Sequence, residues 1–166
     1  MKIGELNSLP REGFVNLLRG IFEHSPWVPE AAFASSPFQS RDTLHAAMLG
    51  VVERSGPEMQ LALLRAHPQL ARRGPLTEAS ASEQGSKGLD RLDDNEATVM
   101  DALNATYIAR FGFPFIIAVR GQRDRNAIIA AMTQRVSHTP EQEHRSALAE
   151  AAKIARFRLE DLIADG

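Results

Sequence analysis

Three short stretches of this chain carry residue types that could do chemistry. The first has His67 followed by Pro68, the second has Glu83 among small polar residues, and the third is rich in phenylalanine. An imidazole with an unperturbed pKa of about 6.5 can give and take protons near neutral pH. Glu83 adds a carboxylate beside the amide of Gln84. These groups could perform general acid–base chemistry on a bound molecule.

The phenylalanine-rich stretch, residues 111–119, is interrupted by Gly112 and Pro114. Because proline breaks regular pairing, the backbone N–H and C=O groups that follow it must find other partners. A ligand in a pocket is one such partner. Burial in the core is the alternative, and the rings of Phe111, Phe113 and Phe115 are expected there at least in part.

The first two stretches also have purely structural interpretations. Pro68 disfavours the helical conformation for the residue before it, so His67 should lie at or just past a helix C-terminus, where it could simply bond nearby carbonyls. Ser80 and Glu83 have the spacing of a capping box and could simply start a short helix. The residue types alone leave both interpretations open.

Several other chemistries are excluded or weakly supported. The chain has no cysteine, which excludes disulfides, thiolate nucleophiles and cysteine-ligated metals. The other histidines form no His-x-x-x-His pair, which leaves a metal site with weak support, and phosphate-binding glycine loops and a nucleophile elbow are missing from the sequence. We therefore expect no metal site. These histidines are His24, His45, His138 and His144.

The elements that must position these residues are predicted to be helices, because apolar residues recur at spacings of three and four. Helices are expected over residues 14–22 with Ser8 as a cap, over 44–52, over 57–67, over 92–111 closed by Gly112, after Asp124, and after Thr139 with Pro140 and Gln142. Residues 25–38 are expected to be irregular. Residues 72–91 are expected to form a long active-site loop with one helical turn near Glu83. The prediction is an all-α, single-domain bundle of about six or seven helices over residues 1–166.

Composition indicates the class of protein. The chain has 166 residues, 43% of them hydrophobic and 24% charged, which is typical of one soluble globular domain. A formal net charge of -2 argues against nucleic acid or a membrane as the main partner. The sequence has neither a signal-peptide pattern at Met1 nor an apolar stretch long enough for a membrane span. A cytoplasmic protein is expected.

Several motifs together resemble one protein family, the 2-oxo-4-hydroxy-4-carboxy-5-ureidoimidazoline (OHCU) decarboxylases, over nearly the whole chain. The motifs are Phe22-Glu23-His24-Ser25-Pro26-Trp27, His67-Pro68-Gln69-Leu70, Ser80-Ala81-Ser82-Glu83-Gln84, Leu103-Asn104 with Tyr107, Phe111-Gly112-Phe113-Pro114-Phe115-Ile116, and Arg158-Leu159 near Asp161-Leu162. Several separate motifs in the same order are far more specific than any one of them.

The resemblance implies an all-helical carboxy-lyase of purine metabolism. Such an enzyme converts OHCU to (S)-allantoin during urate degradation, uses no cofactor, and works as a homodimer on this small ureidoimidazoline substrate. His67 would be the catalytic residue, and we hypothesise that Glu83 assists it by fixing the substrate ring. The substrate-binding residues would be Pro68, Ser80, Ala81, Ser82, Glu83, Gln84, Phe115, Ile116, Ile117, Ala118 and Val119. The alternative is a helical adaptor without catalytic activity, which uses the phenylalanine-rich turn as a hydrophobic anchor.

Overall fold

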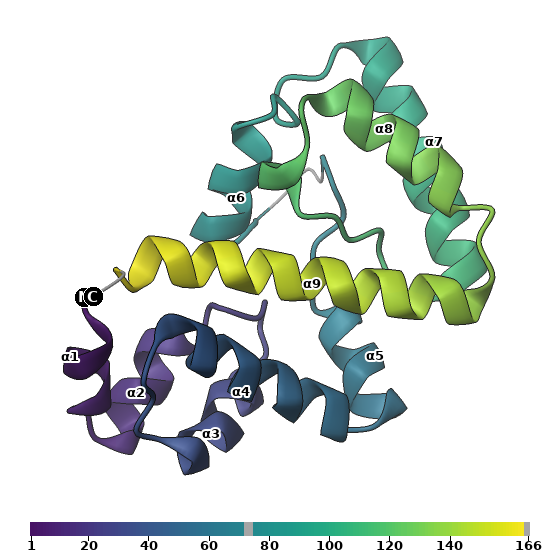
Figure 1. The fold of residues 1–166 in the computed structure, drawn as a ribbon. Coiled ribbons are helices and arrows are strands. Elements are labelled where there is room, and N and C mark those ends of the chain that lie inside the picture. The colour runs from purple at the N-terminus through teal and green to yellow at the C-terminus, as the bar shows by residue number, and fades with distance from the viewer. Residues whose placement is uncertain (72–74, 165–166) are drawn as a thin grey trace. The chain divides into compact units, whose positions relative to one another are not determined.

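The computed structural model describes residues 1–71 and 75–164, which form helices joined by turns and loops (Figure 1). These ranges contain no β-strand, and Lys2 and Ala164 form only an isolated bridge. The all-α prediction is confirmed. The α-helices are α1 (Ile3–Asn7), α2 (Arg11–Leu18), α3 (Trp27–Ala32), α4 (Arg41–Arg54), α5 (Pro57–Arg65), α6 (Glu78–Gly85), α7 (Asp94–Phe111), α8 (Arg125–Arg135) and α9 (Pro140–Leu162), and the 3₁₀-helices are η1 (Phe33–Ser35) and η2 (Val119–Gly121).

The helices fall into two compact units, which we describe separately. Unit 1 comprises Met1–Ala66 and Ala152–Gly166, and unit 2 comprises His67–Ala151. Helix α9 contributes residues to both units, and every predicted site residue belongs to unit 2. The expectation of one domain over residues 1–166 stays a prediction.

Unit 1 has an aromatic core around α2. The ring of Phe14 lies edge-on to Phe33 at 5.2 Å and is stacked with Phe38 at 5.9 Å between centroids. Helix α3 packs against both α2 and α4, and Leu44 and Met48 of α4 are fully buried. Burial of these groups is the main source of stability for such a unit.

The sequence prediction for the start of unit 1 was wrong in three places. Helix α2 ends at Leu18 instead of continuing to residue 22, and Ser8 is the C-cap of α1 instead of the cap of α2. Residues 27–32 form helix α3, although they were expected to be irregular. Pro29 fits there because it lies in the first turn, where the missing N–H has no intrahelical partner to lose.

The helix caps predicted for unit 2 are largely confirmed. Gly112 closes α7 in the left-handed conformation, with φ 78° and its N–H bonded to Ile108 O. The Asp124 side chain caps α8 by accepting from Ala127 N at 2.8 Å. Thr139 and Gln142 bond each other's backbone N–H at 3.0 and 3.2 Å, which is the expected capping box.

No helix in the described ranges combines the length and the apolar character that a bilayer crossing requires.

Candidate active site

His67 lies directly after the C-cap of α5, as predicted, and its side chain is buried, with 7% of the residue exposed. Two amide side chains hold the backbone of the turn that follows it. Asn104 Nδ2 of α7 donates to Leu70 O at 3.0 Å, and Ala71 N donates to Gln84 Oε1 of α6 at 2.9 Å. Ala71 has φ 56°, a left-handed conformation that costs a residue with a Cβ roughly 1–2 kcal/mol. The two hydrogen bonds help to hold the turn in that conformation.

The capping interpretation of Ser80 and Glu83 is wrong. Helix α6 begins one turn earlier than that pattern suggests, because Thr77 is its N-cap and its side chain accepts from Ser80 N at 3.2 Å. Glu83 therefore lies in the last turn of an eight-residue helix. Residues 72–91 were expected to be a loop with one helical turn near Glu83. Residues 72–74 of that range lie outside the described residues, and residues 78–85 form the eight-residue helix α6.

The predicted binding residues of α6 divide between two faces of the helix. Ser80 and Gln84, four residues apart, are buried, whereas Ala81 and Ser82 are exposed. Glu83 is partly exposed. A role for Ala81 and Ser82 in binding stays a prediction.

Gln84 has a defined amide orientation. Its oxygen must face Ala71 N because that group is a donor, so its Nε2 is directed elsewhere. Within the described ranges no hydrogen bond to Nε2 is formed. Gln84 therefore has two N–H donors for a ligand while its oxygen supports the turn after His67.

The 115–119 segment is fully buried and belongs to no α-helix, with each residue at most 5% exposed. Two of its backbone groups are bonded to neighbouring helices. Arg135 Nη1 of α8 donates to Ile116 O at 2.7 Å, and Ala118 N donates to Glu150 Oε2 of α9 at 3.1 Å. Ile117 lies between these two residues, and within the described ranges neither its N–H nor its C=O forms a hydrogen bond.

These three stretches are neighbours within unit 2. The turn after His67 is bonded to α6 through Ala71 and Gln84, and η2, which begins at Val119, packs against α6. The structure thus brings the imidazole-bearing turn, the carboxylate-bearing helix and the buried backbone segment to the same part of the fold.

Comparison with known proteins identifies the family. The OHCU decarboxylase family model matches residues 7–160. The chain belongs to this family. It is 45% identical over 159 residues to the 2-oxo-4-hydroxy-4-carboxy-5-ureidoimidazoline decarboxylase of Haloferax volcanii, covering 96% of this chain and 94% of that protein. The enzyme of the same name from Halalkalicoccus jeotgali is 40% identical, covering 98% of this chain and 92% of that protein.

A solved structure of (S)-allantoin synthase supports the same assignment. It superposes with a TM-score of 0.81 at 35% sequence identity, covering 98% of this chain and 54% of that chain. Membership of the OHCU decarboxylase family favours the enzyme over the adaptor that the sequence alone left open.

Two arginines near the C-terminus of this OHCU decarboxylase family member already have carboxylate partners in unit 1. Arg158 Nη1 donates to Glu23 Oε2 at 2.7 Å and to Gly20 O at 2.9 Å. Arg156 bonds Asp42 at 2.5 Å and Glu160 at 2.8 Å.

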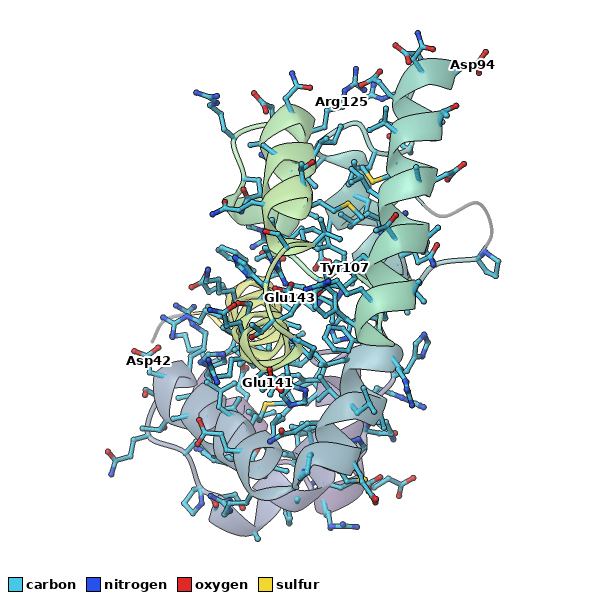
Figure 2. The ribbon with its side chains drawn as sticks, turned by 90° about the vertical axis from the view of Figure 1, so that its right-hand side faces the viewer. Asp42, Asp94, Tyr107, Arg125, Glu141 and Glu143 are labelled. Carbon is cyan, nitrogen blue, oxygen red and sulfur yellow. The ribbon has the colours of Figure 1, made fainter. Side chains whose placement is uncertain are left out.

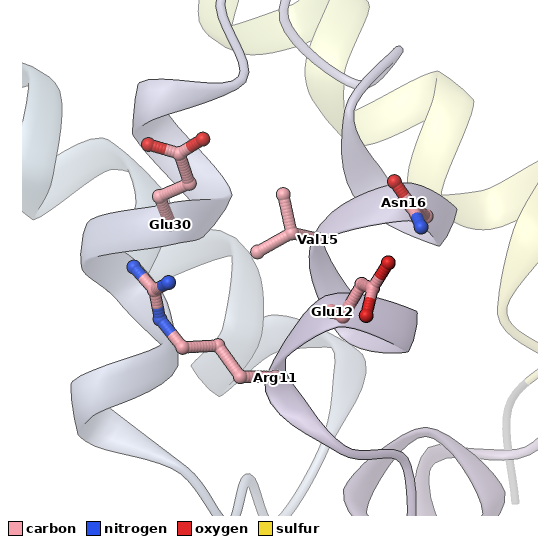
Figure 3. Close-up of a pocket in the computed structure, with 5 residues that line it drawn as sticks. All are labelled: Arg11, Glu12, Val15, Asn16 and Glu30. Atoms are coloured by element: carbon pink, nitrogen blue, oxygen red, sulfur yellow. The ribbon is translucent and has the colours of Figure 1, made fainter.

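A hollow of about 330 Å³ in unit 1 is separate from the predicted site residues. It is bounded by Arg11, Glu12, Val15 and Asn16 of α2 and by Glu30 of α3 (Figure 3). Four of these five side chains are polar and exposed. Nothing in the structure indicates an occupant.

The described residues hold no cluster of three or more histidine, aspartate or glutamate side chains that could bind a metal ion. The sequence did not direct attention to Arg135 or Glu143, both of which are buried. A signal was present, because each is a charged residue on the apolar stripe of its helix. Arg135 follows the buried Ile128 and Met132 at helical spacing, and Glu143 precedes the buried Ala147 by four residues.

Proposed function

We propose that this protein removes carbon dioxide from OHCU and gives (S)-allantoin in the breakdown of uric acid. The observation that carries the proposal is the match to the OHCU decarboxylase family over residues 7–160, with relatives of similar length at 40–45% identity. The arrangement of unit 2 is consistent with it, because a buried imidazole, a carboxylate-bearing helix and a backbone segment with unused donors and acceptors are neighbours.

The substrate can supply the electron sink for this reaction. The bond between the ring carbon and the carboxylate breaks, carbon dioxide leaves, and the electron pair passes into the adjacent C=N bond of the ring. A proton then adds to one face of the planar intermediate. We expect this chain to need no cofactor for these steps, because the substrate itself holds the charge that a cofactor would otherwise accept.

We assign to His67 the position beside the carbon of OHCU that loses its carboxylate. Its imidazole would hydrogen-bond the hydroxyl and carboxylate of OHCU, and Pro68 would fix the turn beside it. Glu83 would hold the ring and polarise the ureido nitrogens. These roles are extended from the family's motif and stay proposals.

Recognition of the ring would come from the 115–119 segment and from α6. The N–H and C=O of Ile117 form a donor–acceptor pair that matches the N–H and C=O edge of a ureide, and the Nε2 of Gln84 can donate to a ring oxygen. Because the Ile117 groups are buried, a ligand without complementary groups would leave them unpaired, at a cost of about 1–3 kcal/mol each.

The decisive experiment generates OHCU in situ and follows the chirality of the allantoin formed, with and without the protein. We expect the protein to accelerate the formation of (S)-allantoin, whereas decay in buffer should not favour one face of the planar intermediate. His67→Asn should fold and lose about 10²–10⁴-fold in turnover. A folded His67→Asn protein that forms (S)-allantoin at the wild-type rate would refute the role of His67.

A homodimer in the cytoplasm is part of the proposal by family resemblance. The sequence also suggests that residues 27–38 could supply apolar dimer contacts. Val28, Ala32 and Phe38 of this region are buried within unit 1, whereas Trp27 and Phe33 are partly exposed. Light scattering of the purified protein tests the dimer, which would give about twice the 18.2 kDa chain mass.

A further inference from the structure

Two charged side chains are buried next to the 115–119 segment. Glu143 of α9 is fully buried and Arg135 of α8 is 8% exposed. Arg135 Nε donates to Glu143 Oε1 at 2.6 Å, and the Tyr107 hydroxyl of α7 donates to the same oxygen at 2.5 Å. Figure 2 shows Tyr107 and Glu143 next to each other. Burying an ion pair is costly and often contributes no net stability, so we consider a role for this pair in addition to stability.

Arg135 connects this buried pair to the backbone segment. Its Nη1 donates to Ile116 O at 2.7 Å, and its Cζ lies 4.4 Å from the centroid of the Phe115 ring. The guanidinium is planar and has several fixed N–H groups, so one side chain can bond Glu143, bond Ile116 and stack on Phe115 at the same time. A lysine ammonium cannot reproduce that set of contacts.

The contact with Ile116 determines which backbone groups remain available. Ile116 O is bonded to Arg135 of α8 and Ala118 N to Glu150 of α9, so the backbone on both sides of Ile117 is fixed. The N–H and C=O of Ile117 form no hydrogen bond within the described ranges and remain available. A shift of this segment would change which backbone groups are bonded and which remain available.

We propose that Arg135 is a positioning residue for substrate recognition, which holds Ile116 O so that the N–H and C=O of Ile117 face the ureide of the substrate. The inference rests on the proposed function, because the substrate must bear that donor–acceptor edge. Glu143 keeps Arg135 in place, and the Tyr107 hydroxyl donates to the same Glu143 oxygen as Arg135 Nε.

The competing explanation is that the buried network only stabilises unit 2. Two conservative variants separate these explanations. Arg135→Lys keeps the positive charge beside Glu143 but removes the bond to Ile116. Tyr107→Phe removes a hydrogen bond from the same carboxylate and leaves the contacts of Arg135 with Ile116 and Phe115 intact. Both should lower the melting temperature, but only the first should change recognition.

The test measures KM and kcat on OHCU generated in situ, together with the melting temperature of each variant. We expect Arg135→Lys to raise KM about ten-fold or more, and Tyr107→Phe to leave KM within about two-fold of the wild type. Equal KM values for the two variants at comparable melting temperatures would overturn the inference.

A second measurement uses only the wild-type protein, in case Arg135→Lys does not fold. In a ¹⁵N-labelled sample titrated with (S)-allantoin, we expect the Ile117 amide resonance to shift more than that of Ala118, whose N–H is bonded to Glu150. A larger shift at Ala118, or binding that leaves Ile117 unchanged, would overturn the inference while the decarboxylase proposal stands. A wild-type protein that neither binds (S)-allantoin nor forms it from OHCU would overturn both.

Discussion

Glu83→Gln, compared with Thr77→Ala, separates catalysis from helix capping in α6. Thr77 is the N-cap, and its side chain accepts from Ser80 N at 3.2 Å. Loss of such a cap costs about 1 kcal/mol. In a protein of this size that corresponds to a melting temperature lower by about 2–4 °C. Thr77→Ala should therefore lower the stability of the protein and leave its kinetics close to those of the wild type.

Glu83→Gln should instead impair the kinetics and leave the stability of the protein nearly unchanged. A carboxylate in the last turn lies at the negative end of the helix dipole, so loss of that charge contributes about 0.3–1 kcal/mol in favour of the folded state. We expect the melting temperature to change by no more than about 2 °C, and kcat/KM to fall about ten-fold with weaker substrate binding. The assay pairs a thermal melt with the rate of (S)-allantoin formation from OHCU. Wild-type kinetics in Glu83→Gln, combined with a melting temperature as low as that of Thr77→Ala, would refute this reasoning.

Three further predictions concern the stability of unit 2. Phe115→Ala should lower the free energy of unfolding by about 3–5 kcal/mol in chemical denaturation, because the ring is 1% exposed. Gly112→Ala should cost about 1–2 kcal/mol in the same assay, because φ is 78° at the end of α7. Burial, followed by the hydrogen bond to Glu143, raises the pKa of Tyr107 above its ordinary value near 10. The unfolded chain releases this proton first, so stability present below about pH 10 should be lost above it at up to about 1.4 kcal/mol per pH unit. Chemical denaturation between pH 8 and 11 should show this fall in the free energy of unfolding for the wild type but not for Tyr107→Phe.

The capping residues at helix ends were the part of the fold that the sequence predicted well. Gly112, Asp124 and the pair Thr139 and Gln142 act on backbone groups within four residues of themselves, so the neighbouring residues contain nearly all the relevant information. The start of α6 was harder to predict. Thr77 and Ser80 are both cap-type residues three positions apart, and only the structure shows which of them comes first.

The site was predictable only in part. His67 and Glu83 could be identified from residue type and from family resemblance, and the position of His67 at a helix end follows from Pro68. The groups that support the site could not be paired from the sequence. Asn104 bonds Leu70 across 34 residues, and Ala118 bonds Glu150 across 32 residues. Local spacing does not encode such pairs, although the charged residues on apolar stripes indicated that some pairing had to exist.

Unit 1 is formed by two separate stretches of the chain, and this affects how the protein folds during synthesis and how it tolerates truncation. Residues 67–151 form one continuous stretch, whereas unit 1 needs both ends of the chain. The buried carboxylate of Glu23 meets Arg158 only after 135 further residues have been synthesised. During translation, unit 2 can therefore close before unit 1 does. A truncation just before Arg158 would leave that carboxylate without its guanidinium partner, so deletions at the end of α9 should impair the folding of residues near the start of the chain.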